Sequence, residues 1–168
     1  PDQGPQVTDG GDVDAVAGGL VEDDLAHGRL EGQAALGPDQ RRTLQEAWPS
    51  FSTGTKRSLV ITLAEIAESD VDADFGAVFR LALDDGDDAV RLAALEGLWE
   101  DEDETLVPPL VRLLNSDPST NVRAAAAVSL GRFARAGELE ELNPKAAAVV
   151  RDALLEAIRS QEQDVEVR

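Results

Sequence analysis

The chain has 168 residues, of which 42% are hydrophobic and 4% are aromatic, and it contains no cysteine. The missing cysteines exclude disulfides, thiolate metal sites and cysteine nucleophiles. The formal net charge of -19 argues against nucleic-acid and membrane partners, since both polyanions are bound through lysine and arginine. No apolar run approaches the length of a membrane span, and we expect a cytoplasmic protein with an aliphatic core.

Residues 1–37 differ in composition from the rest of the chain. They hold 8 of the 14 glycines and eight acidic residues against one arginine, which is typical of a flexible linker. The stretch "VDAVAGGLVEDDLAHGRL" has room for one or two short helical turns anchored by Leu20, Val21, Leu25 and Leu30. We expect these residues, where ordered, to lie against the remainder of the chain or against a neighbouring chain.

A repeating pattern begins at Pro38 and runs to residue 168. The tripeptides "TKR", "AVR", "NVR" and "EVR" recur at intervals of 34, 32 and 45 residues. An acid precedes three of the arginines by six residues. A period of this length indicates paired helices stacked as a solenoid. The arginines are Arg57, Arg91, Arg123 and Arg168, and the acids are Asp85, Asp117 and Glu162.

The helix signals divide this region into repeats at 38–69, 70–100, 101–134 and 143–168, with an insertion at 135–142. Asp85 and Asp117 are predicted to cap second helices, and Asn143 is predicted to cap a helix that has Pro144 at its first position. That last helix is predicted to cover 144–159 and to be followed by only the start of a second. The residues expected in the core are Val90, Leu95, Leu98, Leu113, Val122, Leu130 and Leu155.

The stretch "FRLALDDGDDAVRLAALEGLWEDED", with Val-Arg after a capping acid and with Pro108 or Pro109 in a first helix, resembles HEAT repeats. It is most similar to the bacterial HEAT-like repeats first described in phycobilin lyases, and the resemblance covers about residues 38–168. It implies an all-α fold, an α-α superhelix of about three and a half helical hairpins, in which acids and arginines form ladders between repeats. The first repeat departs from the pattern, because Phe51 stands where the capping acid should be.

The five acids Glu100 to Glu104 are interpreted as a solvated turn before a helix that starts near Thr105. The alternative is a weak cation site, but no spacing matches a calcium-binding loop. The same interpretation applies to Asp84–Asp88 and, with a slightly more loop-like spacing, to Asp9–Asp14. His27 is the only histidine, so neither a metal site nor a cofactor is predicted, and no nucleophile with a base is apparent.

Four residues are candidates for binding a partner protein. Trp48 and Trp99 each end a helix, where they either pack between repeats or contact a partner at the edge of the array. Arg91 and Arg123 belong to second helices, which form the interaction surface of solenoids. A basic group near the first repeat is expected to pair with the acidic segment upstream rather than to bind phosphate. It comprises Arg41, Arg42, Lys56 and Arg57.

The sequence therefore predicts a non-catalytic scaffold that binds another protein along the concave face of the solenoid. The alternative, which rests only on the resemblance, is a subunit of an enzyme of the phycobilin lyase type. The chain is also expected to be a fragment, truncated at its C-terminal end. We expect the aliphatic face of 144–159 to be covered by a second copy, by residues 1–37 of a neighbour or by further residues of the same protein. That face comprises Val149, Val150, Leu154, Leu155 and Ile158.

Overall fold

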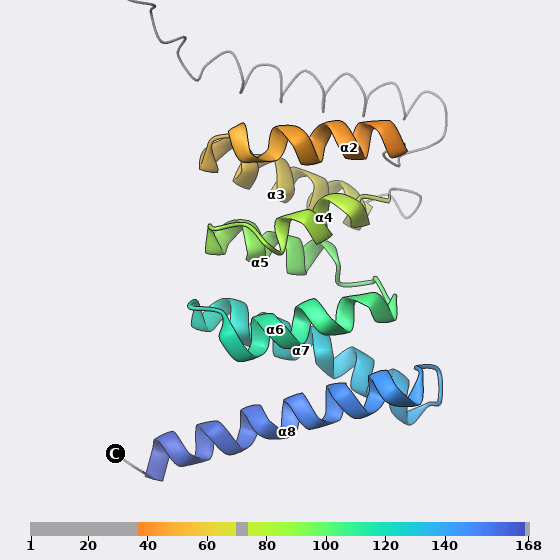
Figure 1. The fold of residues 1–168 in the computed structure, drawn as a ribbon, viewed down its shortest axis with the longest axis vertical. Helices are drawn as coiled ribbons and strands as arrows, with labels where there is room; N and C mark the ends of the chain where they lie inside the picture. The colour runs from red at the N-terminus through yellow and green to blue at the C-terminus, as the bar shows by residue number, and fades with distance from the viewer. Residues whose placement is uncertain (1–36, 70–73, 167–168) are drawn as a thin grey trace, which may run out of the picture. The chain divides into compact units, whose positions relative to one another are not determined.

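The computed structural model describes residues 37–69 and 74–166, with side chains up to Ser160. Within these ranges it contains seven α-helices and two short 3-10 turns and no β-strand, so the predicted all-α class is confirmed (Figure 1). The expectations for Leu20 to Leu30, Asp9–Asp14 and His27 lie outside the described residues. The chain divides into two compact units, one ending at Gly97 and the other beginning at Leu98.

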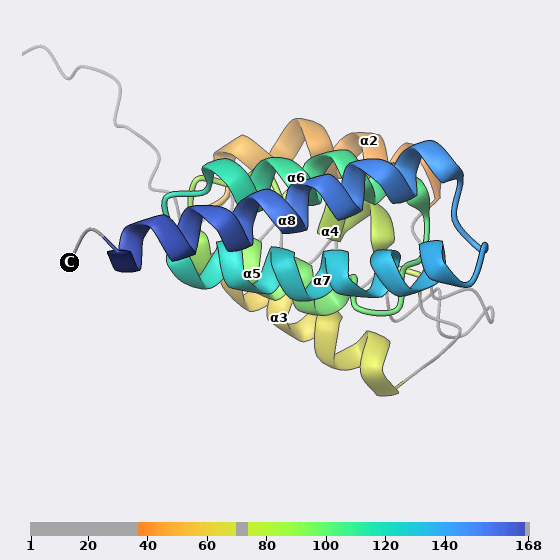
Figure 2. The same ribbon diagram turned by 90° about the horizontal axis from the view of Figure 1, so that it is seen from below.

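The first unit consists of two helical hairpins. The helix α2 (Pro38–Ala47) runs into the 3-10 turn η1 (Trp48–Ser50) and is followed by α3 (Thr53–Ser69), α4 (Gly76–Ala82) and α5 (Asp88–Gly97). The helices α2 and α4 pack in one layer, and α3 and α5 pack in the other (Figures 1 and 2). Aliphatic and phenylalanine side chains fill the space between the layers, with Val60, Leu63, Phe75, Val78, Phe79, Val90 and Ala94 fully or almost fully buried.

The first hairpin shows why its sequence departs from the repeat pattern. Phe51 is buried, and its ring lies 6.2 Å from that of Trp48 at an angle of 58°. The capping function passes to Ser52, whose Oγ accepts the backbone N–H of Thr55 at 3.1 Å. An aromatic contact therefore replaces the expected acid, and a neighbouring hydroxyl starts α3.

The second unit is built from three helices. After the 3-10 turn η2 (Glu104–Leu106) come α6 (Val107–Ser116), α7 (Thr120–Glu138) and α8 (Pro144–Glu166). The helix α7 packs against both α6 and α8, and α6 also contacts α8. Both prolines predicted for the start of α6 lie in its first turn, where a missing N–H costs nothing. The buried side chains include Leu106, Leu110, Val122, Leu130 and Val150.

Two predicted boundaries are wrong in this unit. The helix α8 is continuous from Pro144 to Glu166, so Glu162 lies inside a helix and does not cap a second one. No glycine or proline interrupts "IRSQEQDVE" at 158–166, which is why the helix continues. The helix α7 extends to Glu138, so half of the predicted insertion at 135–142 is helical. Three hairpins and one long helix account for the three and a half repeats.

The predicted core is confirmed except at one residue. Val90, Val122 and Leu130 are fully buried, and Leu95, Leu98 and Leu113 are each 3% exposed. Leu155 is 43% exposed, so its predicted burial is wrong. The physical reason is its position on α8: it stands five residues, or about 140° around the helix, from the fully buried Val150.

Candidate partner-binding surface

A polar cluster joins the two hairpins of the first unit. Asp85 Oδ2 accepts hydrogen bonds from Lys56 Nζ at 2.8 Å and from Trp48 Nε1 at 2.9 Å, and Asp85 Oδ1 accepts the N–H of Asp87 at 3.0 Å. Burial raises the pKa of the Asp85 carboxyl, but the hydrogen bonds from Lys56, the Asp87 backbone and Trp48 outweigh it and lower the pKa overall. The cluster is a structural tie between the hairpins.

A second ion pair lies beside this cluster and corrects one predicted cap. Asp87, not Asp85, caps α5, because its Oδ1 accepts the N–H groups of Ala89 and Val90 at 3.1 and 3.2 Å. Arg57 donates to both Asp87 oxygens, at 2.8 and 2.5 Å, and this bond holds the pKa of the Asp87 carboxyl at about 2. The predicted ladder of acids and basic residues between repeats is thus observed between the first two hairpins.

The arginines of the repeat pattern make the same bond in two hairpins. Arg91 Nη1 donates to the backbone oxygen of Asp85 at 2.7 Å, and Arg123 Nη1 donates to that of Asp117 at 2.8 Å. Asp117 does not cap α7, which begins at Thr120; its carboxylate accepts the N–H of Ser119 at 2.9 Å. The acid and arginine six residues apart therefore brace the turn that enters the second helix of each hairpin.

The acidic run adopts the predicted turn. Glu100, Glu102, Asp103 and Glu104 are exposed and Asp101 is half-buried. Asp101 accepts the N–H of Asp103, and Asp103 accepts the N–H of Thr105, both at 2.9 Å, so the carboxylates close the turn that starts η2. Among the described residues, no group of three or more acids and histidines is arranged to hold a metal ion.

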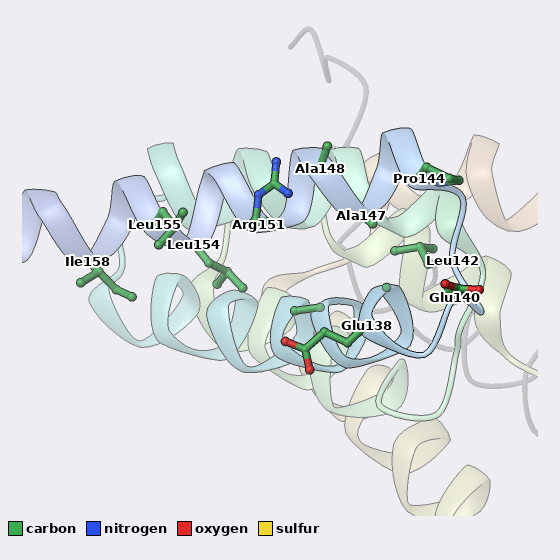
Figure 3. Close-up of a pocket in the computed structure, with 12 residues that line it drawn as sticks. Glu138, Glu140, Leu142, Pro144, Ala147, Ala148, Arg151, Leu154, Leu155 and Ile158 are labelled. Carbon is green, nitrogen blue, oxygen red and sulfur yellow. The ribbon is translucent and has the colours of Figure 1, made fainter.

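A groove of about 710 Å³ lies between the end of α7 and the helix α8 (Figure 3). Leu154, Leu155 and Ile158 form an aliphatic row along α8. Leu155 and Ile158 are 43% and 54% exposed. Three charged side chains also line the groove, and the other described lining residues are small or apolar. The other lining residues are Ala134, Gly137, Glu138, Glu140, Leu142, Pro144, Ala147, Ala148 and Arg151.

The turn between α7 and α8 sets one end of this groove. The N–H of Glu141 bonds to the oxygen of Ala136 at 2.9 Å and that of Glu140 bonds to Gly137 at 3.3 Å, the two bonds of a Schellman helix end. Glu140 has φ 61°, the left-handed conformation that usually requires glycine. Gly137 lies so close to α8 that a Cβ there would stand 2.9 Å from the Cβ of Ala147.

The start of α8 was predicted correctly. The helix begins at Pro144, and Asn143 Oδ1 accepts the N–H of Lys145 at 2.9 Å. The cap starts α8, and the small residues Gly137 and Ala147 allow the two helices to approach closely at the turn. From there the groove follows α8 as far as Ile158 (Figure 3).

The structure separates the four predicted partner-binding residues. Trp48 and Arg91 are each 6% exposed, and their polar atoms bond within the first unit, so neither forms part of the open surface. Arg123 is half-buried beside its own turn. Trp99 is 57% exposed. The structure does not gather these residues into one site, and only Trp99 presents a large open surface.

Sequence reasoning identified one wall of the groove and missed the other. The aliphatic residues of α8 were recognised as a face in need of a cover. The wall on α7, with Ala134, Gly137 and Glu138, was hidden because residues 135–142 were interpreted as an insertion. The helix-forming residues of "FARA" at 133–136, which continue the preceding helix without a proline, were the available signal.

The family is now established. A family model for HEAT repeats matches residues 77–166, more than half of the chain, and the chain therefore belongs to the HEAT-repeat family. The finer resemblance to the repeats of phycobilin lyases stays a prediction. No curated protein and no solved structure matches the chain. None of the helices described is both long and apolar enough to cross a membrane.

Proposed function

We propose that this protein is a non-catalytic HEAT-repeat scaffold and that it binds another protein in the groove between α7 and α8. Repeat proteins of this kind commonly act through extended contact surfaces. The observation that carries the proposal is the aliphatic row on α8, where Leu155 and Ile158 remain 43% and 54% exposed beside a groove of about 710 Å³. Apolar surface gathered in a rimmed groove marks an interaction site.

The groove fits the apolar face of a partner helix. Its floor along α8 from Ala147 to Ile158 corresponds to about 16 Å, or three helical turns. Such grooves accept apolar side chains spaced three and four residues apart. Glu138 and Glu140 lie on the α7 side and Arg151 lies on α8, which favours a helix with a basic flank towards α7 and an acid towards Arg151.

Two further observations support binding rather than catalysis. The described residues that line the groove include carboxylates and one arginine but no serine, threonine, lysine or histidine that would serve as a nucleophile beside a base. Glu140, which lines the groove, has a left-handed backbone conformation that glycine would adopt with less strain. A charged side chain at such a position favours a role for it in binding. No observation on the described residues favours the lyase alternative.

A photo-crosslinking experiment identifies the partner. A benzophenone amino acid replaces Ile158, which lines the groove, or Val128, which is 73% exposed on α7 and does not line it. We expect a protein that is crosslinked from position 158 and not from position 128 in cells that express the full chain. Equal crosslinking from both positions, or from neither, would contradict a groove-directed interaction.

The captured protein is then purified and its affinity for the full chain is measured. The double variant Leu155→Glu/Ile158→Glu should weaken binding at least about tenfold, since burying two carboxylates against an apolar face costs more than 1.4 kcal/mol. Val128→Glu is the matched control and should leave the affinity unchanged. Unaltered binding by the groove variant would remove the groove from the proposal.

A further inference from the structure

A second groove, of about 660 Å³, lies between α2 and α4 in the first unit. It differs from the first in charge, because among the described residues three arginines and one acid line it, in a chain whose net charge is -19. Leu44, Val78 and Leu81 supply its apolar part. The described residues that line it are Pro38, Arg41, Arg42, Leu44, Gln45, Ala77, Val78, Arg80, Leu81 and Asp84.

The helix α2 is incompletely covered by the described residues. None of its ten residues is buried, and Leu44 is half-buried beside the groove. Arg41 and Arg42 are exposed, and among the described residues Arg42 pairs with Asp39, at 3.5 Å in a pair whose side chains are 71% and 94% exposed. An exposed pair of this kind contributes little.

We propose that this groove is the docking site of the acidic segment that precedes it in the same chain, through the stretch Val21–Leu30. Residues 1–36 contain eight acids and one basic residue, Arg29. The stretch combines three consecutive acids, Glu22 to Asp24, with Leu25 and Leu30. The acids of this stretch complement the arginines of the groove, and its leucines complement the aliphatic side chains.

The short connection between Val21–Leu30 and α2 favours this stretch over a separate molecule as the ligand of the groove. Six residues lie between Leu30 and Gly37, and the seven Cα–Cα steps that join the two span at most about 24 Å. The helix α2 is about 15 Å long, so the whole groove is within reach of the stretch. A short linker gives an effective concentration in the millimolar range. A second copy of the chain would have to overcome repulsion between two molecules that each carry a charge of -19.

Hydrogen–deuterium exchange on the full chain tests the docking. The amides of Val21–Leu30 should exchange about tenfold faster in the variant Arg41→Glu/Arg42→Glu, because reversed charges repel the acids that the arginines attract. In the unsubstituted protein the same amides should lose protection at about 1 M salt, where the Debye length falls to about 3 Å. Trypsin cleavage after Arg29 provides an independent readout of the same opening.

Two controls make the test specific. Arg135→Glu/Arg159→Glu makes the same change in net charge at two exposed arginines of the second unit, and it should leave the exchange of Val21–Leu30 unaltered. Adding Glu22→Lys and Asp23→Lys to the groove variant should restore protection through reversed ion pairs, which also shows that the groove variant still folds.

Three results would overturn the proposal. The first is exchange of Val21–Leu30 that is the same in the groove variant and in the unsubstituted protein. The second is an equal effect of the control variant. The third is protection that rises with protein concentration, which would assign the groove to a second copy.

Discussion

Lys56 and Asp85 connect the first two helical hairpins through an ion pair of 2.8 Å whose side chains are only 14% and 7% exposed. The same carboxylate oxygen accepts the indole N–H of Trp48, and Lys56 Nζ lies 5.4 Å from the centre of the Trp48 ring. One carboxylate therefore satisfies a lysine and a tryptophan that are both removed from solvent. A buried charge with these partners cannot be deleted without leaving the others unpaired.

Replacing this carboxylate should destabilise the first unit. Asp85→Ala leaves Lys56 and the Trp48 N–H without an acceptor, and we expect the free energy of unfolding to fall by about 2 to 3 kcal/mol. Denaturant unfolding followed by tryptophan fluorescence, in a Trp99→Phe background that leaves Trp48 as the one tryptophan, measures the change. Glu96→Ala, at an exposed position of α5, is the control and should change stability by less than about 0.5 kcal/mol. Equal effects would contradict a structural role for the cluster.

The ion pair of Arg57 with Asp87 predicts a stability that depends on acid pH. The pKa of Asp87 is lowered from 3.8 to about 2, mainly by its hydrogen bond to Arg57. Because the folded-state pKa is the lower one, the stabilisation is complete above about pH 4 and is lost as the pH falls towards about 2. Asp87→Asn keeps an oxygen for capping α5 but removes the charge.

The thermal midpoints of the two proteins, measured from about pH 6 to about pH 2, report this contribution. We expect the advantage of the unsubstituted protein over Asp87→Asn to shrink steadily below about pH 4 and to fall with added salt, since the pair is partly exposed. A difference that stays constant over this range would show that the charge does not stabilise the fold.

Two glycines in second helices should respond oppositely to alanine. A Cβ at Gly97 would overlap the ring of Phe79, which is 1% exposed, so Gly97→Ala should destabilise the first unit by about 1 to 3 kcal/mol. Gly131 lies inside α7 with no atom within 4 Å of such a Cβ, and Gly131→Ala should stabilise the second unit by about 0.5 to 1 kcal/mol. Equal signs in the two unfolding measurements would contradict the packing described for α4 and α5.

The end of α7 stores backbone strain that one substitution should release. Glu140 is the only described non-glycine residue with a positive φ, at 61°. Glu140→Gly should therefore raise the stability of the second unit by about 1 kcal/mol. The gain is measured as slower hydrogen exchange of the α8 amides in the variant than in the unsubstituted protein. Destabilisation would show that the Glu140 side chain contributes more than its backbone costs.

The sequence predicted the repeats well because the positions that define them are local. Proline in the first turn of α6, Asn143 before α8 and the apolar spacing of Val122 and Leu130 all act within a few residues. The assignment of caps to Asp85 and Asp117 was wrong because each acid sits two residues before the residue at the N-cap position, Asp87 or Ser119, and of these two only Asp87 caps through its side chain. A sequence pattern that spans a single helical turn does not show which of two residues, two positions apart, occupies the N-cap position.

The candidate site was predicted only in part because it depends on contacts between distant residues. Trp48 was a candidate for an open surface, and its burial follows from Asp85, 37 residues away. The groove wall at Gly137 depends on the approach of α8 at Ala147. The exposure of Leu155 was missed because α8 continues as a single helix and packs on α6 and α7 through Val150 instead.

The most direct test of the central claim is hydrogen exchange of the full chain with and without the purified protein that crosslinking identifies. If the groove between α7 and α8 is the binding site, partner addition should slow exchange in peptides from Ala134–Leu142 and Pro144–Ile158. Peptides around the exposed Val128 should remain unchanged. Protection confined to Trp99 or to the first unit, with the groove peptides unaltered, would contradict the proposed binding site.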